Sequence, residues 1–393
     1  MNFFDKVEMA PADPILGLST AFKDDSRPNK VNLGVGAYKT EDLQPLVLSA
    51  VRKAEQRMVT ENLDKEYLLQ DGNPELLKHS IKLVFADVQP DRIFASQTPG
   101  GTAAVRVAGE FLAQQGYKTI YVSNPTWANH NQVFTMAGLE VASYPYYDAE
   151  RKEFAKSQMI EAIKTISSGS PILLHACCHN PTGIDPTLED WKELSTAISE
   201  AGLLPVFDFA YQGFGRGIDA DAVAVRHFLS EGHQMLVANS YSKNFGLYGE
   251  RVGGFYAVTG DAESAQNVGS QVKRIIRANY SNPPLQGSRI VATILASEDL
   301  RQEWEAELAT MRERISGTRK ALADGLKAGG SPVDFSFMYS QNGMFSFSGL
   351  SKAQVDRLRE EYAIYMPASG RINVAGLSPK NLDYVVEAIL AVL

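Results

Sequence analysis

The chain has 393 residues, 44% of them hydrophobic and 21% charged, a composition that is ordinary for a soluble globular enzyme. Its 46 acidic and 38 basic residues give a net charge of -8, which argues against a nucleic-acid partner. No apolar run approaches the ~18 residues of a membrane helix, and the length exceeds that of most single cores, so we expect two subdomains or one large α/β unit.

The N-terminal residues 1–14 mix polar and apolar side chains and lack the basic start and apolar core of a signal peptide. We expect an arm that becomes ordered by packing on something else. Residues 15–24 predict a short amphipathic helix. The extended segment 31–39 follows, where Gly34 and Gly36 would let backbone N–H groups approach a ligand, although a plain glycine turn is an alternative interpretation.

From about residue 45 to residue 258 the pattern alternates between helix-like and strand-like segments, which is typical of a mostly parallel sheet covered by helices. Seven strands are expected, at residues 92–96, 119–123, 141–144, 172–178, 204–209, 235–240 and 253–258. The carboxyl ends of such strands are where these sheets bind ligands. Glycines, hydroxyls, amides and charged side chains directly follow five of them, so we expect a functional site at that edge.

After residue 284 the pattern changes, with a long helical segment at 296–326 that stops at two glycines. A strand, a helix, a strand and a closing helix are then expected at residues 344–348, 352–362, 371–375 and 381–392. We divide the chain into an arm (1–14), part of a small domain (15–45), a large domain (46–300), and a linking helix with the rest of the small domain (301–393).

Residues 175–179, with the sequence His-Ala-Cys-Cys-His, suggest a metal site, because on a strand His175, Cys177 and His179 would share one face. Donors on alternate strand positions lie ~6.6 Å apart, too far to close a tetrahedron unaided, so we predict no metal. Cys177 and Cys178 are the only cysteines, and adjacent cysteines are unsuited to a normal structural disulfide. A reducing cytoplasm fits this cysteine usage.

The stretch 240–251, SYSKNFGLYGER, follows a buried strand and carries an amine, a guanidinium and several hydroxyls between glycines. A phosphorylated aldehyde cofactor requires this mixture, because Lys243 can form a Schiff base while cations and hydroxyls hold the phosphate. The alternative is a solvated loop with Lys243 pointing to water.

This stretch resembles the cofactor-lysine signature of the class I pyridoxal-phosphate aminotransferases, and the similarity extends along almost the whole chain, most closely to bacterial members that use aspartate. The resemblance implies fold type I, with a mostly parallel seven-stranded sheet between helices and a smaller α/β domain. It implies pyridoxal 5'-phosphate in the 46–300 domain. It also implies ping-pong transfer of the amino group of L-aspartate to 2-oxoglutarate, giving oxaloacetate and L-glutamate, with Lys243 as the base.

By the same resemblance, the phosphate-binding positions are Gly101, Thr102, Ser240 and Arg251, joined by Tyr67 from the neighbouring subunit of a homodimer. Gly101 and Thr102 would open a helix, where free N–H groups and the helix dipole favour an anion. An ordinary helix cap is the alternative for these two residues.

The family's ring-binding positions also have matches. Asp208 would keep the ring nitrogen protonated, and His130 and His175 would hold Asp208 as an anion. Asn180 and Tyr211 would hydrogen-bond the phenolic oxygen of the ring and stabilise its ionised form. The aromatic residue that stacks on the ring would be Trp127; taken alone, such a tryptophan is usually core.

Arg371 matches the residue that clamps the substrate α-carboxylate, and Arg277 matches the one that binds the side-chain carboxylate from the neighbouring subunit. A surface salt bridge is the alternative for either arginine. Gly36, Trp127 and Asn180 would also line the substrate site.

The choice of amino acid is less sharply defined by the sequence. Lys39, Thr102 and Asn282 resemble aspartate-preferring members, but Ala37 and the segment 39–48 depart from the pattern, which leaves an aromatic (tyrosine or phenylalanine) aminotransferase as the alternative. A lyase or decarboxylase on the same fold would not need Arg277. A non-catalytic regulatory protein would carry a fused DNA-binding segment, and no basic helix-turn-helix is visible.

Overall fold

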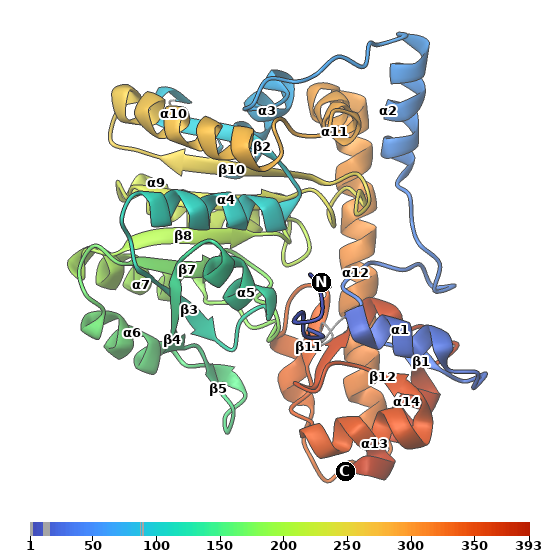
Figure 1. Ribbon diagram of the computed structural model, residues 1–393. Coiled ribbons are helices and arrows are strands. Elements are labelled where there is room, and N and C mark those ends of the chain that lie inside the picture. The colour runs from blue at the N-terminus through green and yellow to red at the C-terminus, as the bar shows by residue number, and fades with distance from the viewer. Residues whose placement is uncertain (1–2, 11–15, 87, 89) are drawn as a thin grey trace.

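A seven-stranded sheet forms the centre of the computed structural model, which describes residues 3–10, 16–86, 88 and 90–393 (Figure 1). The strand order is β2-β10-β9-β8-β7-β3-β4, and only β10 runs antiparallel to its neighbours. The strands are β2 Ile93–Pro99, β3 Thr119–Asn124, β4 Glu140–Pro145, β7 Pro171–His175, β8 Leu204–Phe209, β9 Met235–Ser240 and β10 Val252–Val258. The predicted fold class is therefore confirmed.

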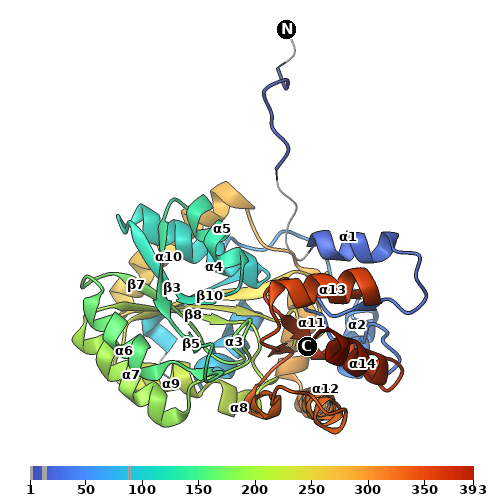
Figure 2. The same ribbon diagram turned by 90° about the horizontal axis from the view of Figure 1, so that it is seen from below.

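Helices cover both faces of this sheet. Alternate residues of each central strand point to opposite sides, and both sets are apolar, so both faces need to be buried. Leu173, Val206 and Leu236 pack into a cluster with residues of α4 Gly101–Gln114, α5 Asn129–Met136 and α10 Ala262–Asn279. Their neighbours Leu174 and Phe207 pack on the other face. That face is covered by α3 Pro74–Phe85, α6 Lys156–Thr165, α7 Leu188–Glu200 and α9 Val223–Ser230 (Figure 2).

The strand predicted at 172–178 ends earlier than expected. β7 stops at His175, and Cys178 takes a left-handed backbone conformation with φ of 51°. A strand cannot continue through such a residue, so residues 176–179 form a loop at the carboxyl edge of the sheet.

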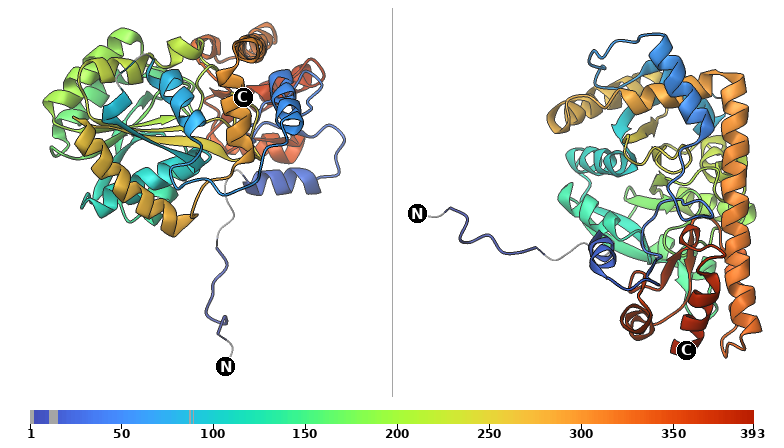
Figure 3. Two further views of the ribbon diagram at one scale, coloured as in Figure 1. Left: turned by 90° about the horizontal axis from the view of Figure 1, so that it is seen from above. Right: turned by 90° about the vertical axis from the view of Figure 1, so that its right-hand side faces the viewer.

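A long helix, α12 Glu298–Ala328, connects two hydrophobic cores and runs along one side of the molecule (Figure 3). Trp304 and Met311 pack against the core of the sheet, while Leu322 and Leu326 pack into a separate C-terminal cluster. The predicted helix at 296–326 is confirmed with a shift of two residues at each end. Before it lie α2 Ser49–Thr60, α8 Ile218–Asp221 and α11 Gln286–Ala296.

The C-terminal cluster combines residues from both ends of the chain. β1 Val31–Asn32 pairs in parallel with β12 Ile364–Tyr365, and β11 Phe345–Phe347 pairs antiparallel with β13 Arg371–Asn373. The helices around them are α1 Leu16–Asp24, α13 Lys352–Tyr362 and α14 Leu382–Val392. This packing sets β13 and the 31–39 segment beside the carboxyl edge of the large sheet.

Two short features lie outside these cores. β5 Tyr147–Asp148 and β6 Glu153–Phe154 form a small antiparallel hairpin. Of the predicted arm, residues 3–10 stand away from the rest of the chain (Figure 2), and the side chain of Met9 is 96% exposed. The remaining arm residues, 1–2 and 11–14, lie outside the described residues. Among the described helices, none is both long and apolar enough to span a bilayer.

Candidate active site

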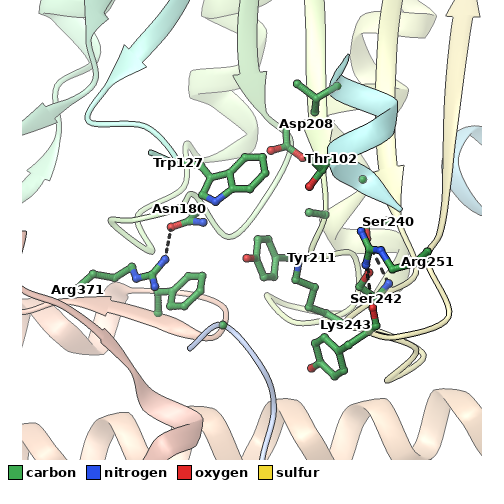
Figure 4. A pocket seen from close by; sticks show the side chains of 16 residues that line it. Thr102, Trp127, Asn180, Asp208, Tyr211, Ser240, Ser242, Lys243, Arg251 and Arg371 are labelled. Atoms are coloured by element: carbon green, nitrogen blue, oxygen red, sulfur yellow. Dashed lines mark hydrogen bonds between the residues drawn. The ribbon is translucent and has the colours of Figure 1, made fainter. Parts of the chain in front are cut away.

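A pocket of about 270 Å³ lies at the carboxyl edge of the sheet, closed on one side by the C-terminal region (Figure 4). It gathers predicted residues from distant parts of the chain. These are Gly36, Gly101, Thr102, Trp127, Asn180, Asp208, Tyr211, Ser240, Lys243, Arg251 and Arg371. Figure 4 shows Arg371 at one end, Ser240 and Arg251 at the other, and Lys243 between them.

One end of the pocket is built for an anion. Gly101 begins α4, whose first turn has no side-chain cap, so its N–H groups and the helix dipole are available to a ligand. Gly100 has φ of 83°, and a Cβ there would lie 2.3 Å from a terminal nitrogen of Arg251. A side chain at this position would therefore displace the guanidinium, and the positive φ independently favours glycine. Arg251 is held by the carbonyl of Tyr248, to which it donates at 2.8 Å.

The carboxylate of Asp208 lies deeper, near the end of β8, and is 9% exposed. His130 Nε2 lies 3.0 Å from Asp208 Oδ2, and the hydroxyl of Thr126 lies 2.8 Å from His130 Nδ1 and 3.1 Å from His175 Nε2. The Thr126 hydroxyl can accept from His175 and donate to His130, which then donates its remaining N–H to Asp208. Burial alone would raise the pKa of Asp208, but His130, His175 and Lys243 hold it below its ordinary value.

Lys243 follows β9 in a turn that is anchored from behind. Asn244 accepts a 2.6 Å hydrogen bond from the indole of Trp304, and Phe245 stacks on that indole with a centroid distance of 4.4 Å. The ammonium of Lys243 lies 5.0 Å from the centre of the Tyr211 ring. Burial lowers the pKa of Lys243 to about 8, with Arg251 and Arg371 adding to the shift and Asp208 opposing it. The amine is therefore easier to deprotonate than that of an ordinary lysine.

Arg371, on β13, is 4% exposed and has no carboxylate partner among the described residues. Its terminal nitrogens donate to Asn180 Oδ1 at 3.2 Å and to the carbonyl of Gly34 at 2.6 Å, while its Nε has no partner in the described part of the chain. The guanidinium lies 4.0 Å above the ring of Phe345. Burial lowers its pKa to about 10. A buried cation without a counter-ion is suited to an anionic ligand.

Four predicted residues do not line this pocket. His130 and His175 lie behind Asp208. Tyr67 is 84% exposed and lines a separate surface hollow with Tyr280 and Asn282. Arg277 is exposed near the end of α10 and donates to Ser281 Oγ at 2.5 Å. Because Ser281 lies between Tyr280 and Asn282 in the chain, Tyr67 and Arg277 belong to the same region of the surface.

Other residues line the pocket although the sequence did not single them out: Val105, Ala210, Ser242, Tyr248 and Phe345. Ser242 and Tyr248 belong to the stretch 240–251, so their proximity to Lys243 in the sequence could have indicated that they line the pocket. Phe345 had no such signal, because its position depends on the pairing of β11 with β13.

The histidines of the possible metal site are engaged in other contacts. His175 Nε2 contacts Thr126, and the two ring nitrogens of His179 lie 2.9 Å from Ser123 Oγ and 2.8 Å from Thr182 Oγ1. A second group, Cys177, Cys178 and Asp221, places its ligand atoms within 4.8 Å of one another. Both oxygens of Asp221 already accept backbone N–H groups, from Gly213, Gly215 and Arg216.

The fold and the pocket place a buried lysine between an uncapped helix start and a buried arginine. Residues 28–389 match the model of aminotransferase class I and II, so the chain belongs to this family. It is 50% identical to the aspartate aminotransferase of Escherichia coli K12, over 99% of this chain and all of that protein, and 48% identical to that of Haemophilus influenzae, over 99% of this chain and all of that protein.

Solved structures agree with this assignment. The aromatic-amino-acid aminotransferase from Burkholderia pseudomallei, covalently bound to pyridoxal phosphate, superimposes with a TM-score of 0.97 at 47% identity, with both chains fully covered. The cytoplasmic aspartate aminotransferase from Saccharomyces cerevisiae also gives a TM-score of 0.97, at 38% identity over 99% of this chain and 98% of that one.

Proposed function

We propose that this protein is a pyridoxal-phosphate-dependent aspartate aminotransferase, which transfers the amino group of L-aspartate to 2-oxoglutarate and yields oxaloacetate and L-glutamate. The observation that carries the proposal is the arrangement of one pocket, with Lys243 between an anion-binding helix start and the buried, carboxylate-free Arg371. The 50% identity to an aspartate aminotransferase over the whole chain supports aspartate as the donor.

The residues present fit the cofactor. The start of α4, Ser240 and Arg251 would hold its phosphate, and Asp208 would hold the proton on its ring nitrogen. Asn180 and Tyr211 would donate to its ring oxygen, while Trp127 would cover one face of the ring. When bound, pyridoxal phosphate supplies an aldehyde that bonds to amines and a ring that withdraws electrons from the substrate Cα.

The side chains of this chain then have distinct tasks. Arg371 binds the substrate α-carboxylate through two N–H groups and so fixes the direction of the Cα–H bond. Lys243 Nζ would take the proton from the substrate Cα, a task that suits an amine whose pKa burial lowers to about 8. In the domain division proposed here, residues 46–300 would hold the cofactor and the small domain would supply Arg371.

We also propose a homodimer in which Tyr67 and Arg277 complete the partner's pocket. Both residues lie on one exposed region, outside the pocket of their own chain. An exposed tyrosine, and an arginine that has no carboxylate partner in the described part of the chain, would there reach a phosphate and a substrate carboxylate. The adjacent cysteines suit a reducing compartment, so we assign the protein to the cytoplasm.

An aromatic amino acid is the second candidate donor. It is supported by the structural similarity to the aromatic-amino-acid aminotransferase from Burkholderia pseudomallei and by Ala37, a small residue beside the pocket residue Gly36. The two candidates differ in the group that Arg277 would meet, because phenylalanine has no side-chain carboxylate.

The test is to measure amino transfer from aspartate and from phenylalanine to 2-oxoglutarate. Purified protein should be yellow, borohydride should fix the cofactor to the peptide containing Lys243, and aspartate should have the higher kcat/KM. Label on another lysine would refute the role of Lys243, and a preference for phenylalanine would select the second candidate.

Mixed dimers test the shared site. Lys243→Ala and Arg277→Ala chains, each nearly inactive on aspartate, are dissociated and refolded together, with each variant treated alone as the control. In a two-fold dimer half of the molecules are mixed and each mixed dimer has one native site of two, so about a quarter of native activity should return. Control-level activity in proven mixed dimers would show that Arg277 does not act across subunits.

A further inference from the structure

The loop that carries Asn180 is held by hydrogen bonds to the carboxylate of Asp185, a residue that does not line the pocket. Asp185 accepts the backbone N–H of Cys178 at 2.8 Å through Oδ2 and that of His179 at 2.9 Å through Oδ1. These two residues directly precede Asn180. Asp185 has no ion-pair partner among the described residues, so its contacts with the backbone define its role.

Pairing with the neighbouring strand does not reach residues 178 and 179, because its last bond is that of the Ala176 N–H to the Asp208 carbonyl at 2.9 Å. β7 ends at His175, and Cys178 has a positive φ of 51°. The N–H groups of residues 178 and 179 lie beyond the β7–β8 pairing and are bound by Asp185 instead, as buried backbone donors need a partner. Burial raises the pKa of Asp185 to about 6, against the lowering effect of the same two hydrogen bonds. Desolvation therefore disfavours the charged form of Asp185, and the two backbone hydrogen bonds offset part of that cost.

Asn180 has to be oriented in two directions at once. Its Oδ1 accepts from Arg371 at 3.2 Å. Figure 4 shows its amide nitrogen on the side away from Arg371. A rotation of the loop would therefore disturb both the arginine and the group that receives the amide N–H.

Asp185 also contacts the segment that leads to β11. Asn342 Nδ2 donates to Asp185 Oδ2 at 3.3 Å, and the N–H of Asn342 donates to the carbonyl of Gly183 at 2.5 Å. Three residues later comes Phe345, whose ring supports Arg371. One carboxylate therefore connects the loop of Asn180 to the strand beneath its arginine partner.

We propose that Asp185 is a positioning residue, which fixes Asn180 so that its amide serves the ring oxygen of the cofactor and Arg371 together. This inference rests on the proposed function. Asp185 does not line the pocket and acts through the backbone of residues 178 and 179.

The test uses Asp185→Asn in the substrate-free holoenzyme. The variant keeps the shape of the side chain, but its NH₂ group cannot accept an N–H, so one loop hydrogen bond is lost. The readout is the pH midpoint at which the visible absorbance of the bound cofactor changes. Weaker donation from Asn180 disfavours the ionised ring oxygen, so the midpoint should rise by about 0.3–1 pH units, the size expected for one weakened hydrogen bond.

A double-mutant cycle separates this role from general stabilisation. In an Asn180→Ala background, Asp185→Asn should cause no further shift, because the residue through which it acts is gone. The matched control is Asp190→Asn. Asp190 also accepts a backbone N–H, that of Thr187 at 2.8 Å, but at the start of α7 and outside the pocket. This control should lower Tm and leave the midpoint unchanged.

An unchanged midpoint in Asp185→Asn, or the same shift in both backgrounds, would overturn the proposal. If Asp185→Asn does not fold, Asp185→Glu, which keeps both acceptors but displaces them, is taken through the same cycle with the same criteria. A wild-type protein without cofactor absorbance would refute the proposed function and this inference together. Normal wild-type turnover with an unresponsive Asp185 variant refutes the inference alone.

Discussion

Replacing Arg371 by alanine should remove most of the activity on any amino acid. In the structure this guanidinium is 4% exposed and has no carboxylate partner among the described residues, so the substrate α-carboxylate would be its counter-ion. Truncating one member of a buried charge pair takes away about 2–5 kcal/mol. At ~1.4 kcal/mol per tenfold change, kcat/KM should fall by about 30-fold to several thousand-fold.

The variant Arg371→Lys should lose less kcat/KM than Arg371→Ala. The lysine keeps the charge, but its ammonium is a point donor and cannot make two parallel hydrogen bonds to one carboxylate. The loss of one charge-assisted hydrogen bond is about 1.5–3 kcal/mol, or roughly 10- to 150-fold in kcat/KM.

The assay is the single-turnover reaction of holoenzyme with amino acid, followed by cofactor absorbance, so that 2-oxoglutarate does not contribute. Aspartate and phenylalanine should lose similar factors, because both have an α-carboxylate. Unchanged cofactor absorbance in the variants is the control. A loss confined to aspartate, or a loss below tenfold in the alanine variant with cofactor fully bound, would contradict the assigned role of Arg371.

Three further predictions concern other residues. Arg277→Ala should lower kcat/KM for aspartate by about 30-fold to several thousand-fold while phenylalanine suffers much less, and equal losses would indicate a role in folding or cofactor binding. Because the pKa of Lys243 is lowered to about 8, its neutral, nucleophilic form grows as pH rises, so the rate at which cofactor-free protein recovers bound cofactor should increase about tenfold per pH unit below 8 and level off above it. A recovery rate that stays constant from about pH 6 to about pH 9 would show that deprotonation of the Lys243 amine does not limit cofactor binding. Trp304→Phe leaves the carbonyl of Asn244 without its donor and removes buried volume, so the free energy of unfolding should fall by about 2–4 kcal/mol, measured by chemical denaturation, whereas a loss under about 0.5 kcal/mol would contradict the anchoring role.

The sequence predicted the sheet well because its strands are short apolar runs bounded by turn residues. It also brought Asn180 and Tyr211 into one site by a simple rule, since each follows the end of a neighbouring parallel strand. The end of β7 was missed, because the left-handed conformation of Cys178 depends on the hydrogen bonds to Asp185 and not on a local glycine. Phe345 was missed for a related reason, since a pairing between separate strands sets its place.

The pairing of β1 with β12 has a consequence for synthesis of the chain. Val31 leaves the ribosome early, but its partner Ile364 is translated only near the end. The nascent protein can complete the large sheet first, when β10 pairs with β2. The strand β1 stays unpaired until β12 has been made. Arg371 is translated later still, so the pocket lacks the residue proposed to bind the substrate α-carboxylate until almost the last residues have been added.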